Sequence, residues 1–136
     1  MKVVALVPIK TNNERLPNKN TKVFKNGRPL IKYIQETLKK VQLLDEIYIF
    51  CSDTSIKEYL LPEVCFLERS TRLDSPTTTS NDILKSFIDE VQADIYILAH
   101  ATSPFISKES IERGLENVIQ NGYDSALSVK KIQDFL

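Results

Sequence analysis

Short apolar runs alternate with segments of helical period along this chain, and the alternation limits the folds that it can adopt. We predict strands at residues 2–7, 46–51, 64–67, 94–99 and 125–129. The first run is apolar at almost every position, which is typical of a strand buried on both faces of a parallel sheet. Strands separated by helices pair in parallel through right-handed crossovers. The sequence therefore predicts an α/β fold, a three-layer α/β/α sandwich with a mostly parallel, Rossmann-like sheet.

Turn residues mark the start of the first predicted helix. Pro8 is expected to end the first strand, and Asn26-Gly27 predicts a turn. Pro29 suits the first position of a helix, which we expect over residues 30–41. The apolar period predicts that its buried stripe holds Leu30, Tyr33, Ile34, Thr37, Leu38 and Val41.

Three further helices are predicted between the later strands. A short helix follows Asp53, which either caps it or takes part in catalysis, and a longer helix spans residues 80–91. Ser107 is expected to cap the last helix, which stops near Asn121-Gly122.

Length and composition favour a single globular domain over residues 1–136. Hydrophobic residues make up 42% of the chain, and 18 Lys and Arg balance 18 Asp and Glu. A nucleic-acid-binding domain usually has a basic excess, so that class is disfavoured. No apolar run reaches the length of a membrane span, and no signal-peptide pattern follows Met1, so we expect a cytoplasmic protein. Cys51 and Cys65 form no CxxC pair and predict no zinc site.

The expected strand order places two loops across a binding crevice. In open α/β sheets, ligands bind outside the carboxyl ends of the strands, where the strand order reverses. If the order begins 3-2-1-4, the loops at residues 8–28 and 100–106 face each other there.

The first of these loops is strongly basic. Residues 10–28 contain Lys10, Arg15, Lys19, Lys22, Lys25 and Arg28 against one acid, Glu14. Such a loop suits a phosphate ligand, although a solvated lysine-rich surface loop fits the charge alone equally well. The loop contains neither GxxxxGK[ST] nor GxGxxG, which disfavours P-loop NTPases and dehydrogenases.

Several segments resemble the cytidylyltransferases that activate acidic sugars, above all the acylneuraminate (CMP-sialic acid) synthetases. VPIKTNNERLPNKN carries the Leu-Pro-x-Lys-Asn element of that family in Leu16, Pro17, Lys19 and Asn20, with Lys10 in the place of a family arginine. IFCSDTSI, LERSTRLDSPTTTSNDIL, ILAHATSPF and ALSV match later family segments in order, so the resemblance covers nearly the whole chain.

The resemblance implies a GT-A-like nucleotidyltransferase that joins CTP and an acidic sugar to give a CMP-sugar and pyrophosphate, with Mg²⁺ as cofactor. It implies that the sugar is sialic acid or a related nonulosonic acid, and that the pathway is surface polysaccharide biosynthesis. Positions carried across imply triphosphate contacts, with the catalytic cations among them, at Lys10, Asn12, Arg15 and Lys19. Nucleotide contacts are implied at Asn20 and Arg69, and cytosine or ribose contacts at Thr78, Thr79 and Ser80. The sugar would meet His100, Thr102 and Ser103.

Some positions depart from the family or fit a plainer role. Glu14, His100 and Ile106 replace a family lysine, glutamine and arginine, and the last two put the identity of the sugar in doubt. Arg69 fits pairing with an acid, His100 a structural role, and residues 77–80 a helix N-cap.

The resemblance also bears on the extent of the chain. It implies an amino-terminal portion of a longer enzyme, with metal-binding aspartates and dimer contacts expected beyond Leu136. A nucleotidyltransferase of the same fold for another sugar or polyol phosphate, and a non-catalytic nucleotide-binding module, stay open as alternatives.

Overall fold

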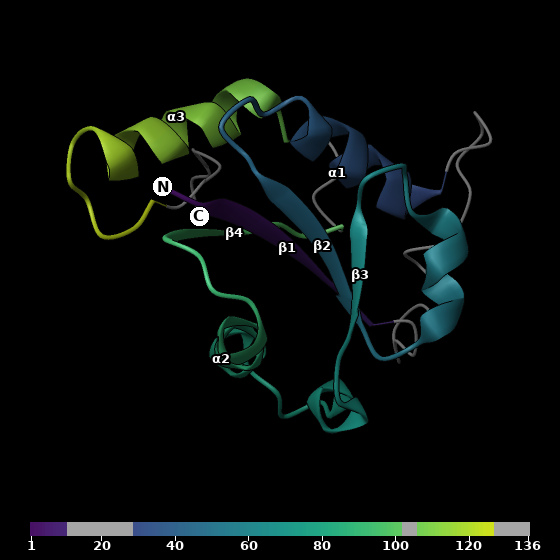
Figure 1. Cartoon of the computed structure of the whole chain (residues 1–136). Helices are drawn as coiled ribbons and strands as arrows, with labels where there is room; N and C mark the ends of the chain where they lie inside the picture. The colour runs from purple at the N-terminus through teal and green to yellow at the C-terminus, as the bar shows by residue number, and fades with distance from the viewer. Residues whose placement is uncertain (11–28, 102–105, 127–136) are drawn as a thin grey trace, which may run out of the picture.

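The computed structural model describes residues 1–10, 29–101 and 106–126, which form a parallel sheet with helices on both faces (Figure 1). The strands follow the order β3-β2-β1-β4, which is the order under which the loops after β1 and β4 were expected to face each other. They are β1 Val3–Ile9, β2 Glu46–Cys51, β3 Cys65–Glu68 and β4 Ile95–Leu98. The helices are α1 Leu30–Lys39, α2 Ser80–Glu90 and α3 Lys108–Ile119, with 3₁₀ helices η1 Thr54–Tyr59 and η2 Thr71–Asp74.

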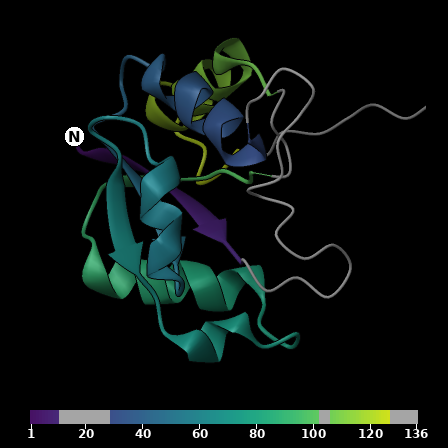
Figure 2. The same ribbon diagram turned by 90° about the vertical axis from the view of Figure 1, so that its right-hand side faces the viewer.

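Strand β1 lies between β2 and β4 and contributes side chains to two separate hydrophobic clusters. Val3, Ala5, Val7 and Ile9 belong to the cluster that α1 and α3 cover. Val4 and Leu6 belong to the cluster that α2 covers. This alternation follows from the two-residue period of a strand. Figure 2 shows α1 and α3 on one side of the sheet and α2 with η2 on the other, which confirms the predicted three layers.

The prediction that Pro8 ends the first strand is wrong. Strand β1 continues through Pro8, which pairs with Phe50 of β2, to Ile9. The carbonyl of Leu6 accepts from the Ala99 amide on the β4 side, and Pro8 faces the same side two residues later. Pairing with β4 has ended there, because its last partners are Leu6 and Leu98. The missing N–H of proline therefore removes no bond of the sheet.

The buried stripe of α1 is shifted from the predicted one. It consists of Ile31, Ile34, Gln35 and Leu38, and Val41 is buried just beyond the helix. Leu30, Tyr33 and Thr37 are only partly buried. The apolar period does not predict this shift, because one of the buried positions holds a polar residue, Gln35. Its burial is possible because its side chain is hydrogen-bonded.

Gln35 connects α1 to the segment that leads into β3. Its Nε2 donates to the carbonyls of Ile31 at 3.2 Å and Tyr59 at 3.0 Å. Its Oε1 accepts from the Leu61 amide at 2.8 Å. The side chain is fully buried, and its polar atoms are satisfied by these bonds to the backbone.

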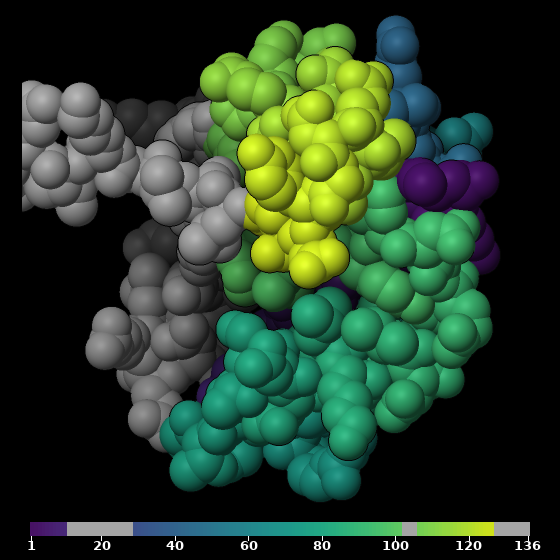
Figure 3. Space-filling view, turned by 90° about the vertical axis from the view of Figure 1, so that its left-hand side faces the viewer, coloured from purple at the N-terminus to yellow at the C-terminus, as the bar shows by residue number. Residues whose placement is uncertain are grey.

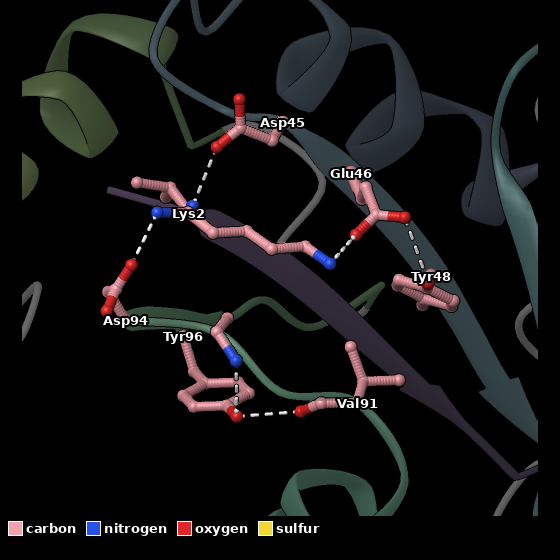
Figure 4. Close-up of polar contacts among 9 residues, drawn as sticks. Lys2, Asp45, Glu46, Tyr48, Val91, Asp94 and Tyr96 are labelled. Carbon is pink, nitrogen blue, oxygen red and sulfur yellow. Dashed lines mark hydrogen bonds and ion pairs between the residues drawn. The ribbon is translucent and has the colours of Figure 1, made fainter.

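Two aspartates fix the amino end of β1 (Figure 4). The Val3 amide donates to Asp45 Oδ2 at 2.8 Å, and the Asp45 amide donates back to the Val3 carbonyl at 2.9 Å. The Lys2 amide donates to Asp94 Oδ2 at 2.6 Å, and the Asp94 amide donates to the Lys2 carbonyl at 2.9 Å. Asp45 precedes β2 and Asp94 precedes β4, so these reciprocal bonds set the register of both neighbours of β1.

Three polar side chains, Lys2, Glu46 and Tyr48, are linked to one another beside this end of the sheet. The Lys2 ammonium is 2.7 Å from Glu46 Oε1, and the Tyr48 hydroxyl donates to Glu46 Oε2 at 3.1 Å. The bond from Lys2 lowers the pKa of Glu46 and raises the pKa of Lys2. Burial, followed by the bond to Glu46, raises the pKa of Tyr48 to about 12.

Other differences from the sequence predictions are small. The helix η2 was not predicted, because its four residues lie in a polar segment without apolar period. Of the predicted fifth strand, Ser125 and Ala126 are not in a strand, and residues 127–129 lie outside the described residues. Within the described ranges, no helix is long and apolar enough to cross a bilayer.

We expect Gln35→Met to lower the free energy of unfolding by about 1–3 kcal/mol, because a fully buried side chain loses its hydrogen bonds to the backbone, among them the one that the Leu61 amide donates. Gln92→Met is the matched control, since Gln92 makes a similar bond to the carbonyl four residues earlier but is exposed. Urea denaturation checks both variants. Equal losses in the two would contradict a role for burial.

We expect Glu46→Gln to be destabilising near neutral pH and nearly neutral at low pH. Because the folded-state pKa of Glu46 is lowered, its contribution is present above the unfolded-state pKa and is lost as pH falls through the folded-state value. Denaturation between pH 7 and pH 3, roughly the range around an ordinary carboxyl pKa, measures the difference. Glu116→Gln, a change at an exposed position of α3, is the matched control and should leave the free energy of unfolding nearly unchanged.

Candidate functional site

The carboxyl ends of the strands place several predicted site residues at one edge of the sheet. Lys10 directly follows β1, Arg69 directly follows β3, and His100 lies two residues after the end of β4; Ser52, which was not predicted, directly follows β2. Ile9 pairs with Cys51 and Cys51 pairs with Glu68, so the positions after β1, β2 and β3 are in register. This is the edge at which open α/β sheets bind their ligands.

Arg69 is the most buried charged residue among those that the structure describes. Its amide extends the sheet by donating to the Cys51 carbonyl at 3.1 Å. Its side chain is 2% exposed, and Nη2 donates to Asp74 Oδ1 at 2.9 Å. The guanidinium carbon lies 6.0 Å from the centre of the Phe50 ring. Pairing with an acid, which the sequence left open, is therefore present, and contact with a nucleotide stays a prediction.

One donor of this guanidinium has no partner. Arg69 Nε is buried and makes no hydrogen bond. Asp74, by contrast, uses both carboxylate oxygens, because its Oδ2 accepts from Ser52 Oγ at 2.5 Å. Buried donors are nearly always paired in folded proteins, so this orphaned N–H needs an explanation, such as a water molecule or a ligand that accepts from it.

Sequence reasoning missed Asp74 and Ser52 as members of this cluster. Asp74 is the last residue of η2, the helix that lacked an apolar signal. Ser52 directly follows β2, and its place at the carboxyl end of a predicted strand was the one available indication.

The predicted base or ribose contacts lie at the start of α2. Thr79 is the N-cap, and its hydroxyl accepts from the Asp82 amide at 3.1 Å. The Asp82 carboxylate accepts from the Thr79 amide at 2.9 Å, a bond that lowers the pKa of Asp82. This capping box confirms the N-cap interpretation of the segment. Nucleotide contacts at Thr78, Thr79 and Ser80 stay predictions.

Helix α2 is held against the sheet by an aromatic cluster. Phe87 is fully buried and packs edge-to-face against Tyr48, Phe50 and Tyr96, with ring centres 5.4, 5.5 and 6.2 Å away. Such contacts fix the position of the helix and therefore of its first turn.

A polar depression of about 600 Å³ lies between η2 and α2. Neither Lys10, Arg69 nor His100 lines it. Its lining residues are Arg72, Leu73, Ser75, Thr77, Thr78, Asp82, Lys85, Ser86 and Asp89. Thr78, one of the predicted nucleotide contacts, is among them, but the mixture of both charge signs does not by itself indicate a phosphate site.

The other predicted residues divide between exposed and undescribed positions. His100 is exposed and Lys10 is partly buried. The remaining predicted contacts lie outside the described residues, namely Asn12, Arg15, Lys19, Asn20, Thr102 and Ser103.

Asp53 caps η1, since its side chain accepts from the Ser55 amide at 2.9 Å. This bond supports the capping alternative for that residue. The neighbouring thiol of Cys51 is buried, and burial raises its pKa. A buried thiol of raised pKa is a poor nucleophile, so Cys51 is structural.

The described ranges contain no group of three or more His, Cys, Asp or Glu side chains that could hold a metal ion. A complete set of protein ligands for Mg²⁺ is thus absent from this part of the chain. Mg²⁺ usually keeps several waters and binds one or two carboxylates together with substrate phosphates, so a complete protein set is not required.

Figure 3 views the flank of the molecule on which α3 and the residues that follow it lie above α2. Strand β4 is the last strand of the sheet on this side among the described residues. Among the described residues, this flank is therefore the β4 edge of the sheet, and His100 follows that edge strand.

Comparison with known proteins gives consistent matches. An N-acylneuraminate cytidylyltransferase of Streptococcus agalactiae is 25% identical over 98% of this chain and 33% of its own length. A pseudaminic acid cytidylyltransferase of Campylobacter jejuni is 28% identical over 89% of this chain and 55% of its own length. The chain thus spans between a third and about half of these relatives.

A solved structure shows the same fold. The structure of CMP:2-keto-3-deoxy-manno-octonic acid synthetase complexed with CTP superimposes with a TM-score of 0.74 over 90% of this chain and 49% of the other, at 19% identity. The family model described as cytidylyltransferase matches residues 4–135. Because that match covers nearly the whole sequence, this chain belongs to the cytidylyltransferase family, as its Leu-Pro-x-Lys-Asn and Thr-Ser-Pro elements predict.

Proposed function

We propose that this chain is the CTP-binding portion of an enzyme that transfers CMP from CTP to an acidic sugar and releases pyrophosphate. The observation that carries the proposal is the family match over residues 4–135. The relatives are named for acylneuraminate, pseudaminic acid and 3-deoxy-manno-octulosonate, all sugar acids. We propose sialic acid or a related nonulosonic acid as the acceptor.

In the proposed reaction, the anomeric hydroxyl of the sugar attacks the α-phosphate of CTP. A new phosphorus–oxygen bond forms, the bond to the β-phosphate oxygen breaks, and pyrophosphate leaves while the hydroxyl loses its proton. Negative charge accumulates on the leaving group, so fixed cations lower the barrier. Lys10, Arg15 and Lys19 are the proposed catalytic cations, with Asn12 beside them on the triphosphate.

The nucleotide is proposed to extend from this loop across the carboxyl edge of the sheet. Asn20 and the buried Arg69 hold it there, and the first turn of α2, at Thr78, Thr79 and Ser80, meets cytosine or ribose. The first turn of a helix leaves backbone N–H groups without partners inside the helix, and such groups can donate to oxygens of the base or ribose.

The acceptor side is proposed to lie after β4. His100, Thr102 and Ser103 face the sugar acid, whose carboxylate a hydroxyl-bearing loop can bind through hydrogen bonds. His100 is exposed and follows the strand that neighbours β1, which is compatible with this role.

Mg²⁺ is proposed as the cofactor, where it would neutralise phosphate charge. The described residues supply no complete ligand set, so we assign no ligand among them. A homodimer, cytoplasmic location and a role in surface polysaccharide synthesis stay predictions from the family.

We expect CTP with Mg²⁺ to raise the melting temperature of the chain and ATP, GTP and UTP to leave it nearly unchanged. A ligand that binds only the folded state stabilises it by about 2.7 kcal/mol at a hundred times its Kd. Differential scanning fluorimetry with the four nucleotides measures this. Equal shifts with all four would contradict specificity for cytosine, and no shift with any would contradict CTP binding by this chain.

We expect Lys19→Ala to weaken CTP binding about 10- to 100-fold without lowering the melting temperature, because a charge-assisted bond to phosphate is lost. Lys32→Ala, which removes a lysine from α1, is the matched control and should bind CTP as the unmodified chain does. Isothermal titration calorimetry gives both dissociation constants. Unchanged affinity in Lys19→Ala would remove this lysine from the site.

A further inference from the structure

Asp74 connects the loops that follow two neighbouring strands. Its Oδ1 accepts from Nη2 of Arg69, which follows β3, and its Oδ2 accepts from the hydroxyl of Ser52, which follows β2. Both oxygens are engaged at 2.9 and 2.5 Å, so the carboxylate cannot turn without breaking a bond. We propose that Asp74 is a positioning residue for the nucleotide: it holds the Arg69 guanidinium so that a free donor faces the ligand, an inference that rests on the proposed function.

The local structure explains why Asp74 reaches both partners. Ser70 caps η2, since its hydroxyl accepts from the Arg72 amide at 3.2 Å. Leu73 is buried in the hydrophobic cluster beneath α2 and anchors the short helix. Because η2 is held at its cap and at its apolar residue, its last residue, Asp74, has a defined position.

Arg69 gains from being held in place. A mobile arginine side chain populates many rotamers, and part of that conformational entropy is lost when it binds a ligand. Here the guanidinium is fixed before any ligand arrives, by Asp74 and by the Phe50 ring. A preorganised donor therefore binds its acceptor at a lower entropic cost.

The unpaired Nε of Arg69 separates this arrangement from an ordinary structural ion pair. Arginine offers five N–H donors, and a purely structural buried arginine is expected to use those that water cannot reach. Nε is buried and has no partner. An oxygen of a bound nucleotide, whether on phosphate, ribose or base, is an acceptor of suitable chemistry at this edge.

The test is a double-mutant cycle on CTP affinity. We expect Asp74→Asn to raise the Kd for CTP about 10- to 100-fold in the unmodified chain, since a charge-assisted bond is lost. In the Arg69→Met background, the same change should have almost no further effect, because Asp74 acts through Arg69. Calorimetry on the four chains gives the cycle.

Matched controls separate positioning from folding. Asp89→Asn removes an exposed carboxylate of α2 and should leave CTP affinity unchanged. Ser52→Ala keeps the ion pair between Asp74 and Arg69 and removes only the bond to Asp74 Oδ2. It should therefore weaken CTP binding less than Asp74→Asn does. It also tests the inference if Asp74→Asn fails to fold, which melting curves without ligand would show.

A direct signal comes from the Arg69 Nε–H group in proton–nitrogen NMR spectra, assigned by its absence in Arg69→Met. We expect CTP to shift this signal and Asp74→Asn to broaden it. The inference is overturned, and the proposed function stands, if the unmodified chain binds CTP and Asp74→Asn binds it equally well. The same holds if Asp74→Asn lowers CTP affinity by the same factor in the unmodified chain and in Arg69→Met. If the unmodified chain does not bind CTP, the proposed function itself fails, and the inference with it.

Discussion

The burial of β1 on both faces is the constraint on which the rest of this structure depends. Val4, Ala5, Leu6 and Val7 have no exposed surface, so helices must cover both sides of the strand. Its neighbours are fixed by backbone pairing and by the reciprocal bonds of Asp45 and Asp94 at its amino end. Once β1 is central, the segments after β2, β3 and β4 necessarily gather at its carboxyl end.

Much of this architecture could be predicted from sequence because it follows from apolar period. The positions of the strands and the three layers depend on which runs are apolar, whereas the strand order was only assumed in the sequence analysis. The predictions that Pro8 ends β1 and that Gln35 lies outside the buried stripe are wrong because the structural role of each residue depends on its neighbours. Pro8 faces the β4 side of β1, where strand pairing has already ended. Gln35 forms hydrogen bonds with three backbone groups. Period alone carries no information on such partners.

The candidate site was predictable to a different degree. The motif resemblance led to Arg69 and to the start of α2, and the structure places Arg69 at the expected edge and Thr79 at an N-cap. It did not lead to Asp74 or Ser52. Asp74 is placed by the short 3₁₀ helix η2, and Ser52 joins the site by its hydrogen bond to Asp74. Both features depend on the tertiary packing around Leu73.

The two ends of the sheet differ in how their polar groups are satisfied, and the difference divides stability from function. At the amino end, the aspartates bond to backbone amides, and Glu46 Oε1, which is buried and has no hydrogen-bond partner, is held by the ion pair with Lys2. At the carboxyl end, a buried guanidinium keeps an unpaired donor. Leaving a buried donor unpaired costs about 1–3 kcal/mol, and a folded chain retains that cost where a ligand recovers it on binding. The satisfied amino end therefore stabilises the sheet, while the carboxyl end is suited to recognition.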